Sequence, residues 1–321
     1  MSDIEGRKRE HIDAVLNKDV SSKGLTAGFE DYRFDHLALP EIDFDAVNTK
    51  TMLFGKNLAA PLLLSSMTGG TDIARHINLS LAEAAQSLGI AMGVGSQRAG
   101  IEKPGFADTF RVRSVAPDIL LFANLGAVQL NYGYSADQAR QAVDMIGADA
   151  LFLHLNPLQE AVQTGGDRNW TGLYDRIAAV VAALDVPVVV KEVGNGISAS
   201  VARRLVDIGV AGIDVAGAGG TSWSEVEAYR QEEPTMRRVA HAFAGWGIPT
   251  VESLNAVVAE APDVPVFASG GIRSGIDAAK AIRLGASLVG MAAPTLGSAL
   301  ETAKAVHDTM TATIEELRLA M

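Results

Sequence analysis

The segment His154 to Glu160, HLNPLQE, places chemically active side chains directly behind an apolar strand pattern at residues 150–155. It contains an imidazole that can exchange a proton, two amides and a carboxylate, from His154, Asn156, Gln159 and Glu160. A strand buried on both faces usually stays apolar to its end, so this change of character indicates the rim of an active site. The alternative is a plain polar turn closed by Pro157. Similar polar clusters behind the other predicted strands favour the active site.

A lysine at the end of another apolar run also indicates chemistry. Lys191 closes the run PVVVKEV, and an ammonium group inside an apolar barrel mouth needs an anion or an electron-rich ring to offset its burial. It can form a Schiff base or stabilise negative charge on a reduced flavin. An ion pair with Glu192 is the alternative, but adjacent strand residues point to opposite faces.

Glu160 is a candidate ligand for a hard cation. A lone carboxylate beside amides suits Mg²⁺, which keeps much of its water and bridges to substrate phosphates. The chain contains no cysteine, so it has no disulfide, no thiolate metal site and no thiol nucleophile. No His/Cys spacing supports zinc.

Two parts of the sequence are candidate anion sites. In SGGIRSG, Gly270 and Gly271 allow close backbone approach and Ser274 can cap a short helix; with the small residues Ala292 and Ala293 after the next strand, this predicts a phosphate site. A Gly-Gly turn that only caps a helix is the alternative. Near the N-terminus, Arg7, Lys8, Arg9 and His11 can clamp a diphosphate together with Arg98, or form a solvated tail.

Composition limits the possible partners. A net charge of −11 argues against nonspecific binding to nucleic acid or anionic membranes. No apolar stretch of about 18 residues is present, so we predict a cytoplasmic protein that does not span a membrane. With 321 residues and 48% hydrophobic content, the chain can bury a large core.

Short apolar runs alternate with helix-like stretches from Pro61 onward, which predicts repeated βα units. The expected strands are residues 62–66, 91–95, 119–124, 150–155, 187–192, 212–215, 264–268 and 288–291. Eight units over about 250 residues predict a TIM (β/α)8 barrel at 61–321, whose site lies at the carboxyl ends of the strands. Residues 248–251 are assigned to a loop beside a helix, and residues 1–60 to an N-terminal extension packed on the barrel. Residues 217–234 form either a mobile lid or an inert surface loop.

Several segments together resemble the type 2 isopentenyl diphosphate isomerases, which are flavoenzymes built on this barrel. They are RKREHI (7–12), SSMTGG (65–70), GSQR (95–98), NLG (124–126), HLNPLQE (154–160), VVVKEVGNGIS (188–198), GAGGTSW (217–223) and ASGGIRSG (268–275). They span nearly the whole chain in the expected order. The combination of HLNPLQE, KEVGNG and GGTSW is highly specific.

The resemblance implies particular roles for named residues. FMN would be bound by Ser66, Met67, Thr68, Ser96, Asn124, Lys191, Thr221, Gly270, Gly271, Ile272, Arg273, Ala292 and Ala293. The substrate would be contacted by Arg7, Lys8, Ser96, Gln97, Arg98, His154, Asn156 and Gln159, and Mg²⁺ would be bound by Glu160. Gln159, His154 and Lys191 would be the catalytic residues. Members assemble as tetramers or octamers, so a homo-oligomer is expected.

The reaction implied is the reversible 1,3-allylic proton shift between isopentenyl diphosphate and dimethylallyl diphosphate in isoprenoid biosynthesis, with FMN first reduced by NADPH or NADH. This sequence departs from the family pattern at Ala216, where a serine usually precedes GAGGT. One hydroxyl contact to the flavin phosphate is then missing, worth about 1 kcal/mol, and Thr221 and Ser222 are candidates to replace it.

Two other functions are compatible with parts of the sequence. An FMN-dependent α-hydroxy acid oxidoreductase would suit GGIRSGIDAAKA and the lysine. Enzymes of that family resemble one another in carrying a histidine base in an NHGGR-like segment after the sixth strand, where this chain has VAGAGGTSW and no histidine. A non-catalytic flavin- or diphosphate-binding barrel is the other alternative. The intact set of polar side chains in HLNPLQE argues against it.

Overall fold

The computed structural model describes residues 4–321 and contains a closed barrel of eight parallel strands, ordered β10-β3-β4-β5-β6-β7-β8-β9. The strands are β3 (Leu62–Leu64), β4 (Ala91–Gly93), β5 (Leu121–Gly126), β6 (Ala150–His154), β7 (Val188–Lys191), β8 (Gly212–Asp214), β9 (Val266–Ser269) and β10 (Leu288–Met291). All eight lie at the predicted places. The TIM-barrel prediction is therefore confirmed.

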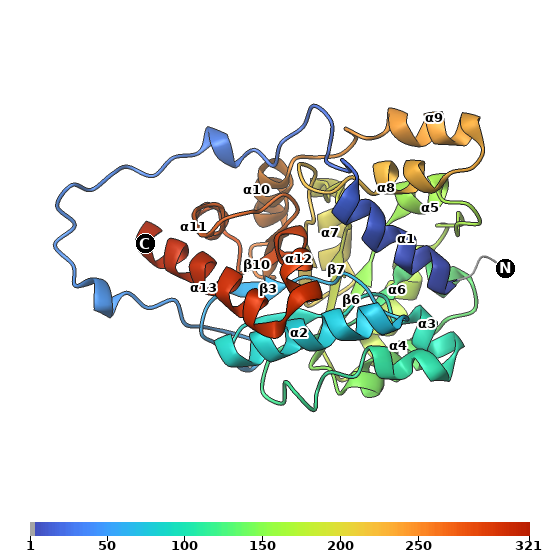
Figure 1. Ribbon diagram of the computed structural model, residues 1–321, viewed down its shortest axis with the longest axis horizontal. Coiled ribbons are helices and arrows are strands. Elements are labelled where there is room, and N and C mark those ends of the chain that lie inside the picture. The colour runs from blue at the N-terminus through green and yellow to red at the C-terminus, as the bar shows by residue number, and fades with distance from the viewer. Residues whose placement is uncertain (1–3) are drawn as a thin grey trace.

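Helices surround the strands (Figure 1). They are α2 (Asp72–Leu88), α3 (Arg98–Glu102), α4 (Ala136–Ile146), α5 (Pro157–Val162), α6 (Leu173–Ala183), α7 (Ala199–Asp207), α8 (Trp223–Arg230), α9 (Pro234–Ala242), α10 (Thr250–Glu260), α11 (Gly275–Arg283), α12 (Ala293–Glu301) and α13 (Ala303–Ala320). Short 3-10 turns lie at Phe29–Asp31, Phe44–Ala46, Pro104–Thr109 and Ala127–Asn131. Among the described residues, none of the helices has the length and apolar character needed to cross a membrane.

The sequence fixes helix ends locally. Helix α4 begins with a capping box in which Ser135 and Gln138 satisfy each other's backbone N–H groups, and it ends at Gly147 in the left-handed conformation that glycine adopts without strain. Residues 248–251 run into the start of α10, in agreement with the predicted loop beside a helix.

The barrel interior toward the amino ends of the strands is filled by a cluster of apolar side chains, called the apolar plug. Phe122, Phe152 and Phe267 pack there, with the first two rings stacked at a centroid distance of 4.3 Å. Leu53 and Leu58 join the same cluster from an antiparallel hairpin, β1 (Thr51–Leu53) and β2 (Lys56–Leu58). The hairpin therefore closes the end of the barrel opposite the predicted site, and the sequence analysis did not foresee it.

The N-terminal region has two further parts. Helix α1 (Ile4–Asn17) packs against α8 and α12 at the side of the predicted barrel mouth. The segment of residues 32–47, called the arm below, arcs away from the barrel on the side of α11 and α13 (Figure 1). Residues 217–234 contain helix α8, so this segment is more ordered than the plain loop considered above.

Candidate active site

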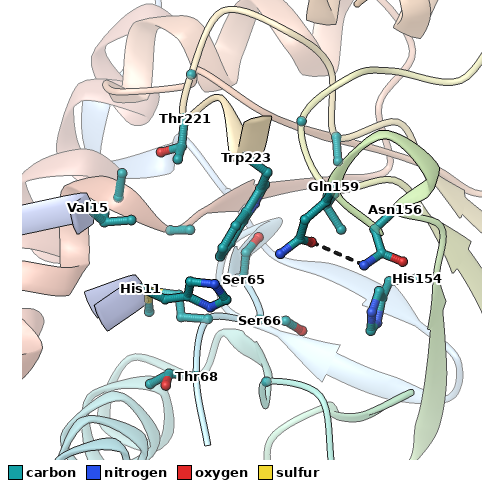
Figure 2. A pocket seen from close by; sticks show the side chains of 18 of the residues that line it. His11, Val15, Ser65, Ser66, Thr68, His154, Asn156, Gln159, Thr221 and Trp223 are labelled. Atoms are coloured by element: carbon teal, nitrogen blue, oxygen red, sulfur yellow. Dashed lines mark hydrogen bonds between the residues drawn. The ribbon is translucent and has the colours of Figure 1, made fainter. Parts of the chain in front are cut away.

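A cavity of about 430 Å³ opens at the carboxyl ends of the barrel strands. It is lined by every residue that the resemblance assigned to FMN, substrate or metal except Gln97, whereas Arg9 of the N-terminal basic cluster is exposed and does not line it. Helix α1 adds Arg7, Lys8 and His11 to its wall, and α8 adds Trp223. Figure 2 shows Asn156, Gln159 and His154 facing the same space as His11 and Trp223. Segments up to almost 300 residues apart in the chain therefore meet around one cavity, as predicted.

The floor of this cavity is a polar layer of the barrel interior. Side chains alternate along a strand, so the residues two positions after the inward-facing Phe122, Phe152, Val189 and Phe267 also face inward. These residues are Asn124, His154, Lys191 and Ser269, and the layer is completed by Asp214 and Ser65. A polar layer therefore rests directly on the apolar plug.

His154 is a neutral imidazole with a fixed proton. Its Nδ1 lies 2.7 Å from Oδ1 of Asn124, which can only accept, so Nδ1 carries the proton and Nε2 presents a lone pair. Burial, followed by the charges of Lys191 and Lys8, lowers the pKa of His154 to about 3. The residue can therefore accept a hydrogen bond or a proton near neutral pH, and it carries no positive charge in the free protein.

Gln97 does not line the cavity, and the structure gives no support to the predicted substrate contact from it. Its side chain is fully buried, and its Nε2 donates to the carbonyl oxygen of Ala142 at 2.8 Å. Its Oε1 accepts from the backbone N–H of Asn124 at 2.9 Å. Gln97 therefore holds the strand end that carries Asn124, because a buried amide must be fully hydrogen bonded.

Glu160 is a buried carboxylate whose two oxygens both accept hydrogen bonds. Oε2 accepts from the backbone N–H of Asp167 at 2.7 Å, and Oε1 from Nδ2 of Asn156 at 3.2 Å. Burial raises the pKa of Glu160. Within residues 4–321, no group of three or more His, Asp or Glu side chains has the geometry of a metal centre. A cation here would take Glu160 as a protein ligand and complete its shell with water or substrate oxygens.

Glu227 of helix α8 is a functional candidate that the sequence analysis missed. Its Oε1 accepts from Nε2 of Gln159 at 3.0 Å and contacts Nε2 of His11 at 2.9 Å. Its Oε2 accepts from Nη1 of Arg230 at 2.5 Å. Burial raises the pKa of Glu227, but the hydrogen bond and charge of His11 and the charge of Arg230 outweigh burial and lower it to about 2. The carboxylate thus stays ionised and fixes the amide of Gln159.

Cationic side chains gather at the mouth of the cavity. Arg7 and Lys8 are half-buried on α1, and burial together with the charge of Arg7 lowers the pKa of Lys8 to about 8. Arg98 lines the same cavity, and its Nη1 is 2.7 Å from Oδ2 of Asp167. Three cations at one mouth of a protein with net charge −11 provide the local basic patch that an anionic ligand requires.

Lys191 makes no side-chain ion pair with its neighbour Glu192. Its Nζ donates to the backbone carbonyl of Glu192 at 2.6 Å. The carboxylate of Glu192 instead accepts from the backbone N–H groups of Val193, Gly194 and Asn195, at 2.6, 2.7 and 2.5 Å. Lys191 therefore remains directed into the cavity that it lines.

The residues fit the predicted flavin. Two glycine turns pack backbone to backbone: a Cβ at Gly270 (φ 98°) would overlap the carbonyl oxygen of Gly217, and one at Gly220 would lie 2.6 Å from the nitrogen of Gly271. Ser274 caps α11 as predicted. Four buried polar atoms around the cavity have no hydrogen-bond partner among residues 4–321, namely Ser65 Oγ, Ser66 Oγ, Thr68 Oγ1 and Asn156 Oδ1. Unsatisfied buried groups of this kind indicate a polar ligand.

The departure at Ala216 lies in the same wall. Ala216 lines the cavity with a left-handed φ of 36°, which is uncommon for a residue other than glycine. Thr221 lines the cavity nearby, whereas the hydroxyl of Ser222 is buried beside that of Ser224 at 3.1 Å. Of the two candidate replacements for the missing serine hydroxyl, Thr221 is therefore the better placed.

The chain is similar to one protein family model and to several named proteins. A family model described as FMN-dependent dehydrogenase matches residues 2–103 and 134–321. A Synechocystis protein named isopentenyl-diphosphate delta-isomerase is 62% identical over 320 residues, covering 100% of this chain and 92% of that protein. A protein of the same name from Stutzerimonas stutzeri is 56% identical over 318 residues, covering 99% and 92%.

Solved structures show the same fold at lower identity. Mandelate oxidase with (S)-2-phenylpropionate has a TM-score of 0.65 at 22% identity, covering 99% of this chain and 91% of that chain. This likeness extends to the fold alone. Because the isomerase sequences match over nearly the whole chain, and the FMN-dependent model over most of it, the chain belongs to the FMN-dependent isopentenyl-diphosphate delta-isomerase family.

Proposed function

We propose that this protein interconverts isopentenyl diphosphate and dimethylallyl diphosphate by a 1,3-allylic proton shift that depends on reduced FMN. The observation that carries the proposal is the meeting of Gln159, His154 and Lys191 with the cationic mouth in one cavity, in a chain 62% identical to a protein of that name. The cavity combines a polar floor for a planar ring with cations for a diphosphate.

FMN would be held by the two glycine turns and the polar floor. The phosphate would take the turn from Gly270 to Arg273 and the start of α12 at Ala292 and Ala293, and the ring would take Ser66, Met67, Thr68, Ser96, Asn124 and Thr221. When bound and reduced, FMN supplies the group that exchanges protons with the alkene. Lys191, emerging from the floor, would stabilise negative charge on the ring.

The protein residues orient the substrate. Gln159 is fixed by Asn156, whose Nδ2 donates to its Oε1 at 3.1 Å, and by Glu227, so its amide can hold the reacting carbons in one position. Arg7, Lys8 and Arg98 would bind the diphosphate, with further contacts from Ser96, His154 and Asn156. Mg²⁺ on Glu160 would neutralise part of the diphosphate charge.

Other parts of the proposal concern the setting of the enzyme. We propose NADPH or NADH as the reductant of FMN, a cytoplasmic location, and assembly into a homo-oligomer. The exposed arm supports assembly because six of its large apolar side chains are accessible, with Leu37 at 68% and Leu39 at 78%. Contiguous exposed apolar surface is typical of protein interfaces.

The α-hydroxy acid oxidoreductase alternative has less support. No histidine occurs between residues 215 and 223, where that chemistry would need a base. The mandelate oxidase structures share the fold at 22% identity or less, which says nothing of the reaction. The non-catalytic alternative would leave the ordered set of Asn156, Gln159 and Glu227 without a role.

The test is an anaerobic NMR assay of isopentenyl diphosphate with FMN, Mg²⁺ and NADPH or dithionite. Appearance of dimethylallyl diphosphate is expected. Absence of that product, with the flavin bound and fully reduced by its absorbance, would overturn the isomerase proposal. Turnover of a 2-hydroxy acid with oxidised FMN would instead support the alternative enzyme.

A further inference from the structure

Asp214 and Lys191 face each other across neighbouring strands in the polar floor of the cavity. They are Cα partners in the parallel pairing of β7 with β8, so their side chains point to the same side of the sheet. That side is the barrel interior, because Val189 belongs to the apolar plug two residues before Lys191. Both are buried, with relative exposures of 7% for Lys191 and 0% for Asp214.

The carboxylate of Asp214 is satisfied on only one oxygen. Its Oδ1 accepts from Oγ of Ser269 at 2.7 Å and from the backbone N–H of Ala216 at 3.2 Å. Its Oδ2 is buried and has no hydrogen-bond partner within the described chain. Burying half a carboxylate in this way is unfavourable unless a positive charge lies close by.

Lys191, the Cα partner of Asp214, supplies that positive charge across the floor. Its Nζ donates to the backbone carbonyl of Glu192 at 2.6 Å and lies beyond the 4.0 Å of a direct ion pair with Asp214. Burial raises the pKa of Asp214, and the ammonium of Lys191 is the largest influence that lowers it. The two other groups close to Lys191 cannot replace Asp214: His154 is neutral, and Glu192 lies on the opposite face of the strand with its carboxylate bound to three backbone N–H groups. Among the inward-facing residues of the floor, Asp214 is the one carboxylate.

We propose that Asp214 is a positioning residue for Lys191: its carboxylate is the counter-charge, acting across the floor of the flavin site, that keeps the Lys191 side chain in place before any ligand binds. The inference deepens the proposed function, since it concerns the lysine assigned to the flavin. It implies that the lysine is preorganised in the free protein.

The sharpest test is a double-mutant cycle on the flavin-free protein. Asp214→Asn and Lys191→Met preserve side-chain size but each leaves the other charge buried and unpaired, so each is expected to lower the urea midpoint of unfolding. The double variant removes both charges, so its loss in urea midpoint is expected to be smaller than the sum of the losses in the two single variants. This cycle needs no substrate, so it can succeed or fail independently of the isomerase assay.

Ser269→Ala provides a matched control. It removes the 2.7 Å hydrogen bond to Asp214 but keeps the carboxylate, so its loss in stability is expected to be much the same with Lys191 or Met at position 191. If Asp214→Asn does not fold, the comparison is made within the Lys191→Met background, where Asp214→Asn is expected to leave the midpoint unchanged or raise it. Additive losses in the cycle, or a further loss in that background, would overturn the proposal.

Flavin binding gives a second readout. In Asp214→Asn the affinity for FMN, followed by quenching of flavin fluorescence, is expected to fall at least tenfold, and Asp214→Glu is expected to recover part of the loss because it restores the charge. Equal losses in Asp214→Asn and Asp214→Glu would indicate a role in packing alone and would contradict the proposal.

Discussion

The imidazole nitrogen Nδ1 of His154 lies 2.7 Å from the side-chain oxygen of Asn124, and the pairing fixes the proton of a half-buried, neutral histidine. The pKa of His154 is lowered to about 3, so the NMR signals of its ring nitrogens are expected to keep the neutral pattern from about pH 8 to about pH 4. Asn124→Asp places a charge beside the ring and is expected to move its titration to higher pH. A wild-type midpoint near the ordinary histidine value would contradict this interpretation.

The same shift has a consequence for stability. Because the unfolded chain binds a proton at His154 near pH 6.5 and the folded chain does not, the free energy of unfolding is expected to fall as the pH drops from about 6.5 toward 3. His154→Gln should make that fall less steep in urea titrations at several pH values. An unchanged slope would mean that the folded protein accepts this proton without cost.

Glu227 is expected to control the reaction through Gln159. Glu227→Gln replaces a charged acceptor by a neutral one, so the amide of Gln159 loses part of a bond worth ~1.5–3 kcal/mol, and kcat should fall about 10- to 100-fold while FMN affinity changes little. The control is Glu225→Gln, which alters a buried carboxylate of the same helix that contacts His241 at 2.9 Å. Equal activities for the two variants would remove Glu227 from the site.

The barrel could be predicted from the sequence because its signal is local. In β6 and β7 an apolar run ends abruptly in a charged or polar residue, His154 or Lys191, and in a parallel barrel such ends must meet at one rim. The glycine turn at residues 270–273 could also be predicted from the sequence. Its backbone lies so close to Gly217 that Gly270 has no room for a side chain, and the Gly-Gly pair in the sequence reflects this.

The missed features depend on contacts that no local pattern encodes. Glu227 lies in the ordinary helical sequence WSEVEAYR, and its role appears only when His11, 216 residues earlier, reaches it. The hairpin at residues 51–58 was hidden because its strands are three residues long, too short to show alternation. The burial of Gln97 away from the cavity could not be predicted, because polarity next to a strand end does not reveal which way a side chain points.

The glycine turn gives a prediction about the cofactor. Gly270→Ala would drive a Cβ into the backbone of Gly217 and would also strain a φ of 98°, so FMN affinity is expected to fall at least tenfold. Gly297→Ala is the matched control, because a Cβ there meets nothing within 4 Å and the residue lies inside helix α12. Flavin titration of both proteins, with thermal unfolding as a check on folding, measures the effect. Retained flavin in Gly270→Ala would refute the proposed phosphate turn.

Glu160 is expected to determine the magnesium requirement. Glu160→Gln keeps the shape of the side chain but removes the negative charge, so the Mg²⁺ concentration for half-maximal activity should rise at least tenfold. Asp167→Asn is the comparison: its carboxylate pairs with Arg98, and it should raise KM for the diphosphate while leaving the Mg²⁺ dependence alone. If Glu160→Gln shows the wild-type Mg²⁺ dependence, this residue does not bind the metal.

The arm is expected to hold copies of the chain together. Its ends are anchored on its own barrel, where Nδ2 of Asn255 donates to the Tyr32 hydroxyl at 3.1 Å and the Arg318 guanidinium lies 4.6 Å from the Phe44 ring centroid. Between these anchors the apolar side chains of Leu37, Leu39 and Ile42 are exposed.

Replacing these three residues by serine should shift the protein to smaller assemblies in size-exclusion chromatography with light scattering, because burial of their apolar surface drives association. Met52→Ser is the control, since Met52 is 69% exposed on the hairpin outside the arm. The thermal stability of the monomer should be unaffected, as the three side chains contribute little to its core. A wild-type mass for the triple variant would show that assembly, where it occurs, uses another surface.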